Sequence, residues 1–325
     1  MSLKNGNFMY KEAWDKIVDA RYIVIVSHIH PDGDTIGSTL ALYSALKETG
    51  KKVALFNATK DELPREFCFL DGYSKIQGKL PKFFDLLVSC DSASFDRLGV
   101  KCGDYDIVNI DHHKSNTNFG DINLVFSEAS SAGVVVYNLL KNNNIKISKK
   151  TAMALYTSVA DDTGFFRYGN IDAKTFKIAS ELIEFGADPK KVADEVNSSV
   201  SLAKTRLIAY MLRNFELDCD ATIASIIFDE ATLEATGAKR SDTKNIISML
   251  RNIVNVKVAL MVLEVKNGCK ISLRSDGKID VSKISAIYDG GGHKGAAGFN
   301  VKSSNLSITR NEIIDLIKRE YEKKE

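Results

Sequence analysis

Histidine and aspartate alternate in one short segment, His28-Ile29-His30-Pro31-Asp32-Gly33-Asp34. It follows the apolar run 22–26, which predicts a buried strand, and precedes the amphipathic run 39–47, which predicts a helix. Open α/β sheets bind ligands at the carboxyl ends of their strands. Imidazoles and carboxylates at such a place are typical ligands of divalent cations. We therefore expect a loop that supplies ligands to two cations.

Other predicted elements deliver similar groups. Predicted strands over 83–90 and 106–110, and a predicted helix over 149–160, are each followed by acidic or imidazole side chains. Parallel strands place such ends at one edge of a sheet. All five histidines of the chain lie in three short segments, which favours a site over scattered structural roles. The expected cluster comprises His28, Asp32, Asp34, Asp91, His112, His113 and Asp162.

The chemistry of this cluster follows from its charge. Four carboxylates in one cleft repel one another and raise one another's pKa, and divalent cations remove that cost. The groups are too many for one tetrahedral zinc but suit two cations that share a bridging carboxylate. Mixed imidazole and carboxylate ligands favour Mn²⁺, with Mg²⁺, Fe²⁺, Co²⁺ or Zn²⁺ as alternatives. Two such ions activate a bridging water, which is the chemistry of phosphoester or phosphoanhydride hydrolysis.

The ordered motifs resemble those of the DHH phosphoesterase superfamily. They are His28-x-x-x-Asp32-x-Asp34, Asp91, Asp111-His112-His113 and Asp162-Thr163-Gly164, and residues 272–275 and 290–298 are similar to the DHH-associated C-terminal domain. Within the superfamily, the chain is similar to the NrnA-type nano-RNases, which are also phosphatases of 3′-phosphoadenosine 5′-phosphate (pAp). The resemblance implies hydrolysis of short RNA oligonucleotides and dinucleotides to 5′-mononucleotides, and of pAp to AMP and phosphate.

The resemblance also implies roles for single residues. The first metal ion would be held by His28, Asp32 and Asp91, and the second by Asp34, Asp91, His112 and Asp162, with Asp91 bridging. His113 would face the scissile phosphate and protonate the leaving oxygen, while Asp111 would orient one of the adjacent imidazoles. Asp161 competes with Asp162 as a ligand, and we prefer Asp162 because it directly precedes Thr163-Gly164. We expect His30, at a position that the motif leaves free, not to be a ligand.

A second group of residues near the C-terminus is expected to bind the substrate. Gly290, Gly291 and Gly292 form a predicted turn in which backbone N–H groups can approach an anion. Arg274 and His293 can grip a phosphate, the arginine through a bidentate fork. The family pattern has these groups facing the metal ions across a cleft between two domains, which favours short substrates.

The expected fold class is α/β with two domains, because 325 residues exceed the usual size of one domain. A mainly parallel-sheet domain with flanking helices is expected over 1–190, a helical connector over 191–215, and a smaller mixed-sheet domain over 216–325. Asn267-Gly268 between two apolar runs predicts a hairpin in the second domain.

Composition limits the partners. The net charge of +2 argues against a large nucleic-acid surface but leaves room for a short anionic ligand. No segment approaches the roughly 20 apolar residues of a membrane span, and no secretion signal is recognised at the N-terminus. The five cysteines include no CxxC pair and indicate reduced, mostly buried thiols. We therefore expect a cytoplasmic protein without a membrane partner, and family members often form homodimers.

Other functions remain open at this point. The superfamily includes soluble pyrophosphatases and exopolyphosphatases, but those pyrophosphatases bind phosphate with a Lys/Arg-rich motif instead of Gly-Gly-Gly-His. Linear or cyclic dinucleotides are alternative substrates, and a nucleotide-binding sensor is the alternative without catalysis. Arg97, in Asp96-Arg97-Leu98-Gly99, is expected to form a structural salt bridge rather than to contact the substrate.

Overall fold

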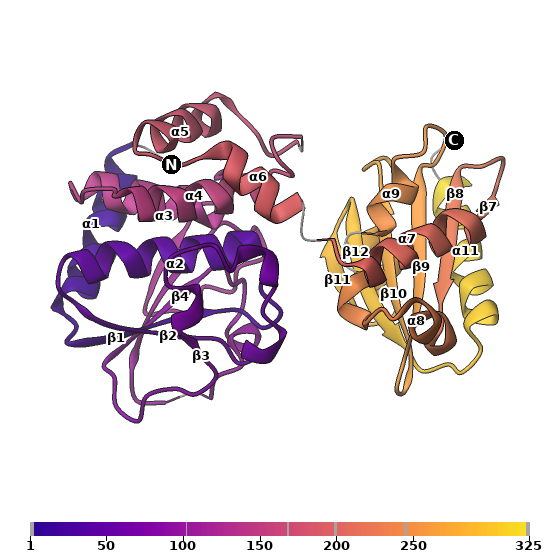
Figure 1. Cartoon of the computed structure of the whole chain (residues 1–325), viewed down its shortest axis with the longest axis horizontal. Helices are drawn as coiled ribbons and strands as arrows, with labels where there is room; N and C mark the ends of the chain where they lie inside the picture. Colours follow the sequence, from indigo (N-terminus) through magenta and orange to yellow (C-terminus); the bar gives the residue numbers. More distant parts are fainter. Residues whose placement is uncertain (1–2, 102, 168, 198–199, 244–245, 323–325) are drawn as a thin grey trace. The chain divides into compact units, whose positions relative to one another are not determined.

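The computed structural model of the chain describes residues 3–101, 103–167, 169–197, 200–243 and 246–322. They form two compact units, Met1–Ser199 and Val200–Glu325 (Figure 1). Of the cysteines, Cys102 lies outside the described residues, Cys90 and Cys269 are buried, and Cys68 and Cys219 are exposed. The expectation of mostly buried thiols is therefore wrong for two of them, which lie on surface segments.

The first unit is built on a six-stranded parallel sheet with the order β3-β2-β1-β4-β5-β6, which confirms the predicted parallel sheet. The chain leaves β1 toward one edge and returns at β4 toward the other, so the switch point for ligand binding lies between β1 and β4. Its strands are β1 (Tyr22–Ser27), β2 (Lys52–Phe56), β3 (Ile76–Gln77), β4 (Leu86–Cys90), β5 (Asp106–Asp111) and β6 (Ile122–Val125).

Strand β4 is shorter than the expected 83–90, because Phe83 is 85% exposed and lies before the sheet. Strands β3 and β6 were not predicted, because they are only two and four residues long. The buried strands β1, β4 and β5 therefore carry the sequence signal, and they are the strands that end at the expected cluster.

Six α-helices accompany this sheet in the described part of the unit: α1 (Leu3–Asp19), α2 (Gly33–Glu48), α3 (Ala132–Asn142), α4 (Lys149–Asp162), α5 (Ala173–Glu184) and α6 (Pro189–Asn197). Short 3₁₀ turns are η1 (Lys60–Glu62), η2 (Arg65–Phe67), η3 (Tyr73–Lys75) and η4 (Phe95–Leu98). Helix α2 begins at Gly33, earlier than expected, because the Asp32 side chain caps it by accepting the Thr35 N–H.

Helix α2 is not amphipathic, contrary to the sequence prediction. It packs between the sheet and helices α3 and α4, so most of its residues are buried (Figure 1). A Cβ atom at Gly37 would lie 2.5 Å from the Ala154 carbonyl oxygen of α4. A glycine is needed there because the two helices approach each other at backbone distance.

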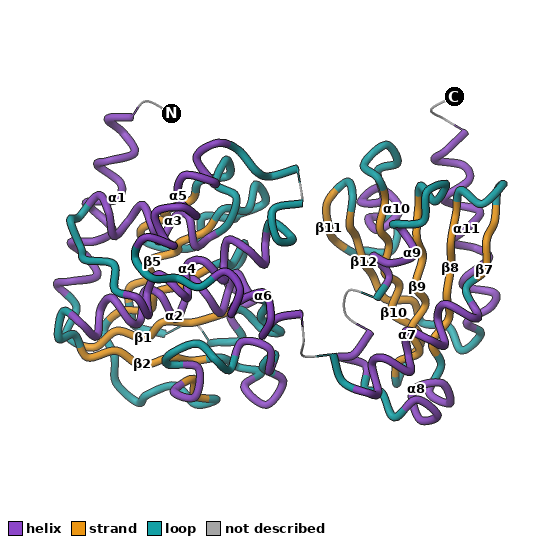
Figure 2. The backbone as a smooth tube through the Cα atoms, turned by 45° about the horizontal axis from the view of Figure 1, so that its top comes forward, coloured by secondary structure: helices purple, strands orange, loops and turns teal. Residues whose placement is uncertain are grey.

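The second unit contains a mixed sheet with the order β11-β12-β10-β9-β8-β7 (Figure 2). Strands β8 and β9 are parallel and the other neighbours are antiparallel, and β9 and β10 form the hairpin predicted at Asn267-Gly268. The strands are β7 (Glu216–Asp218), β8 (Ile223–Phe228), β9 (Val258–Val265), β10 (Gly268–Ser275), β11 (Gly291–His293) and β12 (Ala296–Val301).

Helices cover both faces of this sheet. Val258 and Leu260 of β9 pack with Ile313 of α11 on one face, whereas Ala259 and Met261 pack with Leu207 of α7 on the other. The helices are α7 (Leu202–Asn214), α8 (Glu230–Thr236), α9 (Ile247–Arg251), α10 (Val281–Ala286) and α11 (Leu306–Glu322), with the 3₁₀ turn η5 (Arg240–Thr243). The helix expected over 242–250 is represented by η5 and α9, and residues 244–245 lie outside the described part.

The division between the units falls after Ser199, and the buried Leu207 and Met211 of α7 belong to a core of the second unit. The domain limits at 190 and 215 stay predictions. Among the described residues, no helix combines the length and the apolar character that crossing a membrane requires.

Candidate metal centre

The seven expected His and Asp side chains meet in the first unit, at the carboxyl ends of β1, β4 and β5 and the last turn of α4. They form three overlapping groups, and within each group the potential ligand atoms lie within 4.8 Å of one another. The groups are His28, Asp32 and Asp91; Asp34, His112 and Asp162; and Asp91, His112 and His113. This edge of the sheet includes the switch point between β1 and β4.

Asp91 lies between the imidazoles. Its Oδ2 is 3.6 Å from His28 Nε2, and its Oδ1 is 3.6 Å from His112 Nε2. The Thr35 hydroxyl donates to Oδ2 at 2.5 Å, but Oδ1 is buried and accepts no hydrogen bond from the described residues. Asp91 also has a left-handed backbone with φ of 59°, a strain that is common at functional sites. A buried carboxylate oxygen without a donor, beside imidazole nitrogens, fits a metal cation.

Two imidazoles of the cluster, those of His28 and His112, are oriented by backbone carbonyl groups. His28 Nδ1 donates to the Ile29 carbonyl oxygen at 2.8 Å, and His112 Nδ1 donates to the Ala129 carbonyl oxygen at 3.2 Å. Each hydrogen bond fixes the tautomer in which Nε2 carries a lone pair. Both Nε2 atoms face the carboxylates of the cluster, which is the arrangement that metal-binding histidines require.

Asp34 is held at the N-terminus of α3. Its carboxylate accepts the N–H groups of Ala132 at 2.7 Å and Gly133 at 3.1 Å, and the Ser158 hydroxyl also donates to it. Burial, together with the charges of Asp91 and Asp162, nevertheless raises the pKa of Asp34 well above its usual value. The donors that surround Asp34 therefore do not compensate the negative charge of the cluster.

Asp162 shows the same excess of negative charge. Burial raises its pKa to about 7, and the charges of Asp91 and other aspartates act in the same direction, against the opposing effect of His112. Two cations held by these overlapping groups would supply the missing positive charge. The donor set, its orphaned oxygen and its crowded carboxylates therefore fit divalent cations.

The geometry separates the two neighbouring aspartates at the end of α4. Asp161 Oδ2 accepts the Gly33 N–H at 2.8 Å, and a Cβ atom at Gly33 would lie 2.5 Å from Asp161 Cβ. Asp162 Oδ2 instead lies 3.8 Å from His112 Nε2, and Asn170 Nδ2 donates to it at 3.3 Å. Asp162 therefore belongs to the cluster, and Asp161 fixes the start of α2.

His113 is paired with Asp111. His113 Nδ1 donates to Asp111 Oδ1 at 2.7 Å, and Asn116 Nδ2 donates to Asp111 Oδ2 at 2.5 Å. Burial and the charge of Arg97 lower the pKa of His113, but the hydrogen bond to Asp111 and the charges of Asp91 and Asp111 outweigh them and raise it to about 9. The sequence alone did not reveal this role of Asn116, because Asp111 and Asn116 meet only in the folded chain.

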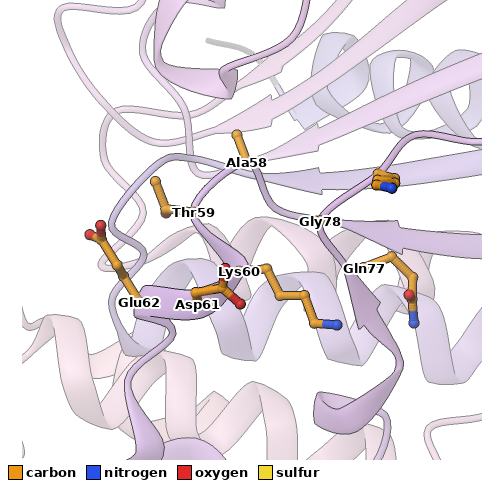
Figure 3. Close-up of a pocket in the computed structure, with 8 residues that line it drawn as sticks. Ala58, Thr59, Lys60, Asp61, Glu62, Gln77 and Gly78 are labelled. Carbon is orange, nitrogen blue, oxygen red and sulfur yellow. The ribbon is translucent and has the colours of Figure 1, made fainter.

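His30 lies outside the three groups. Its exposed side chain pairs with Glu62, with 2.8 Å between Nδ1 and Oε2. Glu62 also lines an open hollow of about 520 Å³ over the ends of β2 and β3 (Figure 3). None of the seven clustered residues lines it; its lining comprises Ala58, Thr59, Lys60, Asp61, Glu62, Gln77, Gly78 and Lys79.

The substrate-binding candidates of the second unit lie on adjacent strands. Arg274 of β10 and His293 of β11 are both opposite Ala296 of β12, so the two side chains share one face of the sheet. Arg274 Nη1 donates to the Leu273 carbonyl oxygen at 3.0 Å. The predicted turn is partly wrong, because residues 291–293 form an edge strand.

The glycines beside this strand have a packing role. A Cβ atom at Gly290 would collide with Phe299, and one at Gly292 would lie 2.5 Å from Ala297 Cα. Gly291, in contrast, has nothing within 4 Å of its Cβ position. Close packing against β12 therefore explains two of the three glycines, and anion binding by this segment stays a prediction.

Each of the two units contains a segment that matches a known protein family. Residues 22–159 match the DHH family, N-terminal domain, and residues 223–323 match the DHHA1 domain. The chain therefore contains a DHH-family domain and a DHHA1 domain. The DHH match includes the ends of β1, β4 and β5, which supply most of the cluster.

Relatives resemble this DHH protein over most of its length. The bifunctional oligoribonuclease and PAP phosphatase NrnA of Thermus thermophilus is 28% identical, with 92% of this chain and 90% of the relative covered. The Bacillus subtilis protein of the same name is 26% identical, with 86% and 90% covered. An exopolyphosphatase-related protein from Bacteroides fragilis has a similar structure, with a TM-score of 0.85, 26% identity, and 98% and 96% of the two chains covered.

Proposed function

We propose that this DHH protein is a two-metal phosphoesterase that hydrolyses short RNA oligonucleotides to 5′-mononucleotides and pAp to AMP and phosphate. The observation that carries the proposal is the cluster of seven His and Asp groups, with the buried, donor-less Oδ1 of Asp91 at its centre. The names of the relatives from Thermus thermophilus and Bacillus subtilis support the choice of substrates.

Two metal positions are proposed from the three groups. His28, Asp32 and Asp91 would hold one ion, and Asp34, His112 and Asp162 the other, with Asp91 shared between them. When bound, two divalent cations supply an activated water and neutralise charge on the phosphoryl oxygens. We favour Mn²⁺, because the ligands combine imidazole and carboxylate, with Mg²⁺, Co²⁺ or Fe²⁺ as alternatives.

His113, Asp111 and Asn116 would act on the leaving group. Asp111 accepts the Nδ1 proton of His113, so the Nε2–H of the protonated ring remains to protonate the leaving oxygen. Asn116 holds the other Asp111 oxygen and thereby fixes the direction of this pair. In the second unit, Arg274 and His293, with the segment 290–292, would grip a substrate phosphate. A cytoplasmic location and a homodimer complete the proposal.

The test is a hydrolysis panel with Mn²⁺: pAp, a 5′-labelled dinucleotide, a pentanucleotide, a long RNA strand and pyrophosphate, each repeated with EDTA. We expect mononucleotides from the short RNAs and AMP from pAp, with little product from the long strand. No product from either pAp or the short RNAs would overturn the proposal. Rapid release of phosphate from pyrophosphate would favour a pyrophosphatase, and binding of pAp without turnover would favour a nucleotide sensor.

A further inference from the structure

Arg97 lies beside the metal centre, in the 3₁₀ turn η4 that follows Asp91. The salt bridge expected for it is not formed, because its guanidinium has no carboxylate partner among the described residues. The side chain is half-buried, so water does not fully replace such a partner. A desolvated guanidinium without an anion is unfavourable, and this calls for a functional explanation.

The polar contact that Arg97 makes is with a metal-ligand candidate. Its Nη2 lies 3.3 Å from His28 Nδ1. That nitrogen already donates its proton to the Ile29 carbonyl oxygen at 2.8 Å, so it has no lone pair for the guanidinium. Two donors therefore face each other, and the N–H groups of Arg97 remain available for an acceptor.

The backbone fixes the position of Arg97 relative to the metal ligands. The Ile29 N–H donates to the Arg97 carbonyl oxygen at 2.8 Å, which joins η4 to the loop after β1. The charge of Arg97 also reaches His113 on the other side of Asp91. Arg97 is therefore a positive group held next to His28 and near His113, at the edge of a centre that would itself contain cations.

An anion is the ligand that satisfies this arrangement. Cations bound in the cluster would repel the guanidinium of Arg97. A phosphate between the cluster and Arg97 would attract both the cations and the guanidinium. The planar fork of arginine matches two phosphate oxygens. We propose that Arg97 binds non-bridging oxygens of the substrate phosphate at the metal centre, and so acts as a catalytic residue. The choice of a phosphate substrate rests on the proposed function.

The test compares wild type with Arg97→Ala, Arg97→Lys and Arg65→Ala; Arg65 is an exposed arginine of the same unit. Three quantities are measured: the Kd of Mn²⁺, the Kd of inorganic phosphate for the Mn²⁺-loaded protein, both by calorimetry, and kcat and KM for pAp. For Arg97→Ala we expect phosphate binding at least about tenfold weaker and kcat/KM lower by about a hundredfold. Mn²⁺ affinity should be unchanged or higher, because a nearby positive charge is removed.

Arg97→Lys should keep part of the phosphate affinity, because an ammonium retains the charge but not the fork. Arg65→Ala should match wild type. The proposal is overturned if the phosphate Kd of Arg97→Ala stays within about twofold of the wild-type value. It is also overturned if Mn²⁺ binding weakens while phosphate binding is unchanged, because Arg97 would then only position His28. If Arg97→Ala does not fold, the Arg97→Lys variant provides the test. A wild-type phosphate affinity in Arg97→Lys would refute bidentate binding of phosphate by the guanidinium.

These readouts also separate this inference from the proposed function. The phosphate titration needs no turnover. If wild type hydrolyses neither pAp nor short RNA, but Arg97→Ala still loses phosphate binding, the proposed function fails and the role of Arg97 in binding stands. If wild type turns over both substrates and Arg97→Ala is indistinguishable from it, the proposed function stands and the inference fails.

Discussion

The neighbouring residues Asp161 and Asp162 allow a matched test of the metal centre. Asp162→Asn removes a charge from the cluster, whereas Asp161→Asn changes a side chain that accepts the Gly33 N–H and lies outside the three groups. Each amide keeps the shape of the carboxylate and a carbonyl oxygen that can accept the existing hydrogen bond. The two variants therefore differ mainly in whether the cluster loses charge.

The expected gain in stability of the metal-free protein follows from the burial of the Asp162 carboxylate and from the charge of Asp91 near it, which both raise the pKa of Asp162. Two like charges about 5 Å apart repel by about 3 kcal/mol at an effective dielectric constant of about 20. The Asp162 side chain is 33% exposed, so solvent screening reduces the effect. We expect Asp162→Asn to stabilise the metal-free protein by about 1–2 kcal/mol near neutral pH and Asp161→Asn to change it little.

The pH dependence of stability tests independently whether Asp162→Asn stabilises the metal-free protein. Burial raises the pKa of Asp162 from its ordinary value of 3.8 to about 7 in the folded protein. Because the folded pKa is raised, the contribution of this carboxyl to stability is fully present below its unfolded pKa and is lost as pH rises through the folded pKa. The advantage of Asp162→Asn should therefore grow from about pH 4 to about pH 7 and then stay constant.

The assay is urea unfolding of EDTA-treated protein across this pH range, followed by calorimetric titration with Mn²⁺. Asp162→Asn should lose strong binding of one Mn²⁺ ion, and Asp161→Asn should keep both. Destabilisation of the metal-free protein by Asp162→Asn would refute the repulsion argument. Loss of Mn²⁺ binding in Asp161→Asn with normal binding in Asp162→Asn would show that the wrong aspartate had been assigned.

Three further changes test other parts of the structure. Asp91→Asn should fold, because asparagine tolerates the left-handed backbone at this position. It should lower kcat/KM for pAp by about a thousandfold or more at saturating Mn²⁺. Substantial retained turnover would contradict the proposal that Asp91 is shared between two ions. Gly33→Ala should lower the free energy of unfolding, measured in urea, by about 1–3 kcal/mol and should weaken Mn²⁺ binding, because the new Cβ displaces Asp161. Gly169→Ala is the control, because the space around its Cβ position is open. His293→Ala should raise KM for a dinucleotide about tenfold with unchanged kcat and Mn²⁺ affinity, and an unchanged KM would exclude His293 from substrate binding.

The sequence predicts the strands that end at the cluster because each is an apolar run followed directly by a polar group. Asp91 and the Asp111-His112-His113 segment could be placed at one sheet edge for that reason. The start of α2 could not be placed as well, because Asp32 both caps the helix and faces the cluster. Strand β11 was missed because a glycine-rich segment is typical of a turn, and its pairing partner lies on β12.

Contacts between distant segments explain the other differences. Asp34 depends on the N-terminus of α3 and on Ser158 of α4, and no local pattern connects these positions. The donor from Asn116 to Asp111 likewise appears only in the folded chain. Arg97 has an acidic neighbour in sequence, which suggested an ion pair, but the fold turns its side chain toward His28 instead.

The close approach of α2 and α4 has a consequence for ion size. Asp34 lies in the first turn of α2 and Asp162 in the last turn of α4, so the gap between these helices sets the spacing of two carboxylates that are proposed to hold one ion. A Cβ atom at Gly37 would collide with the Ala154 carbonyl oxygen and one at Gly33 with the Asp161 side chain, so both glycines permit this close approach. Small and large divalent ions differ by only a few tenths of an ångström in their preferred distance to oxygen, about 2.1 Å for Mg²⁺ and about 2.4 Å for Ca²⁺. We therefore expect the spacing that these glycines allow to influence which ionic radius the site prefers, while the aspartates and histidines supply the charge.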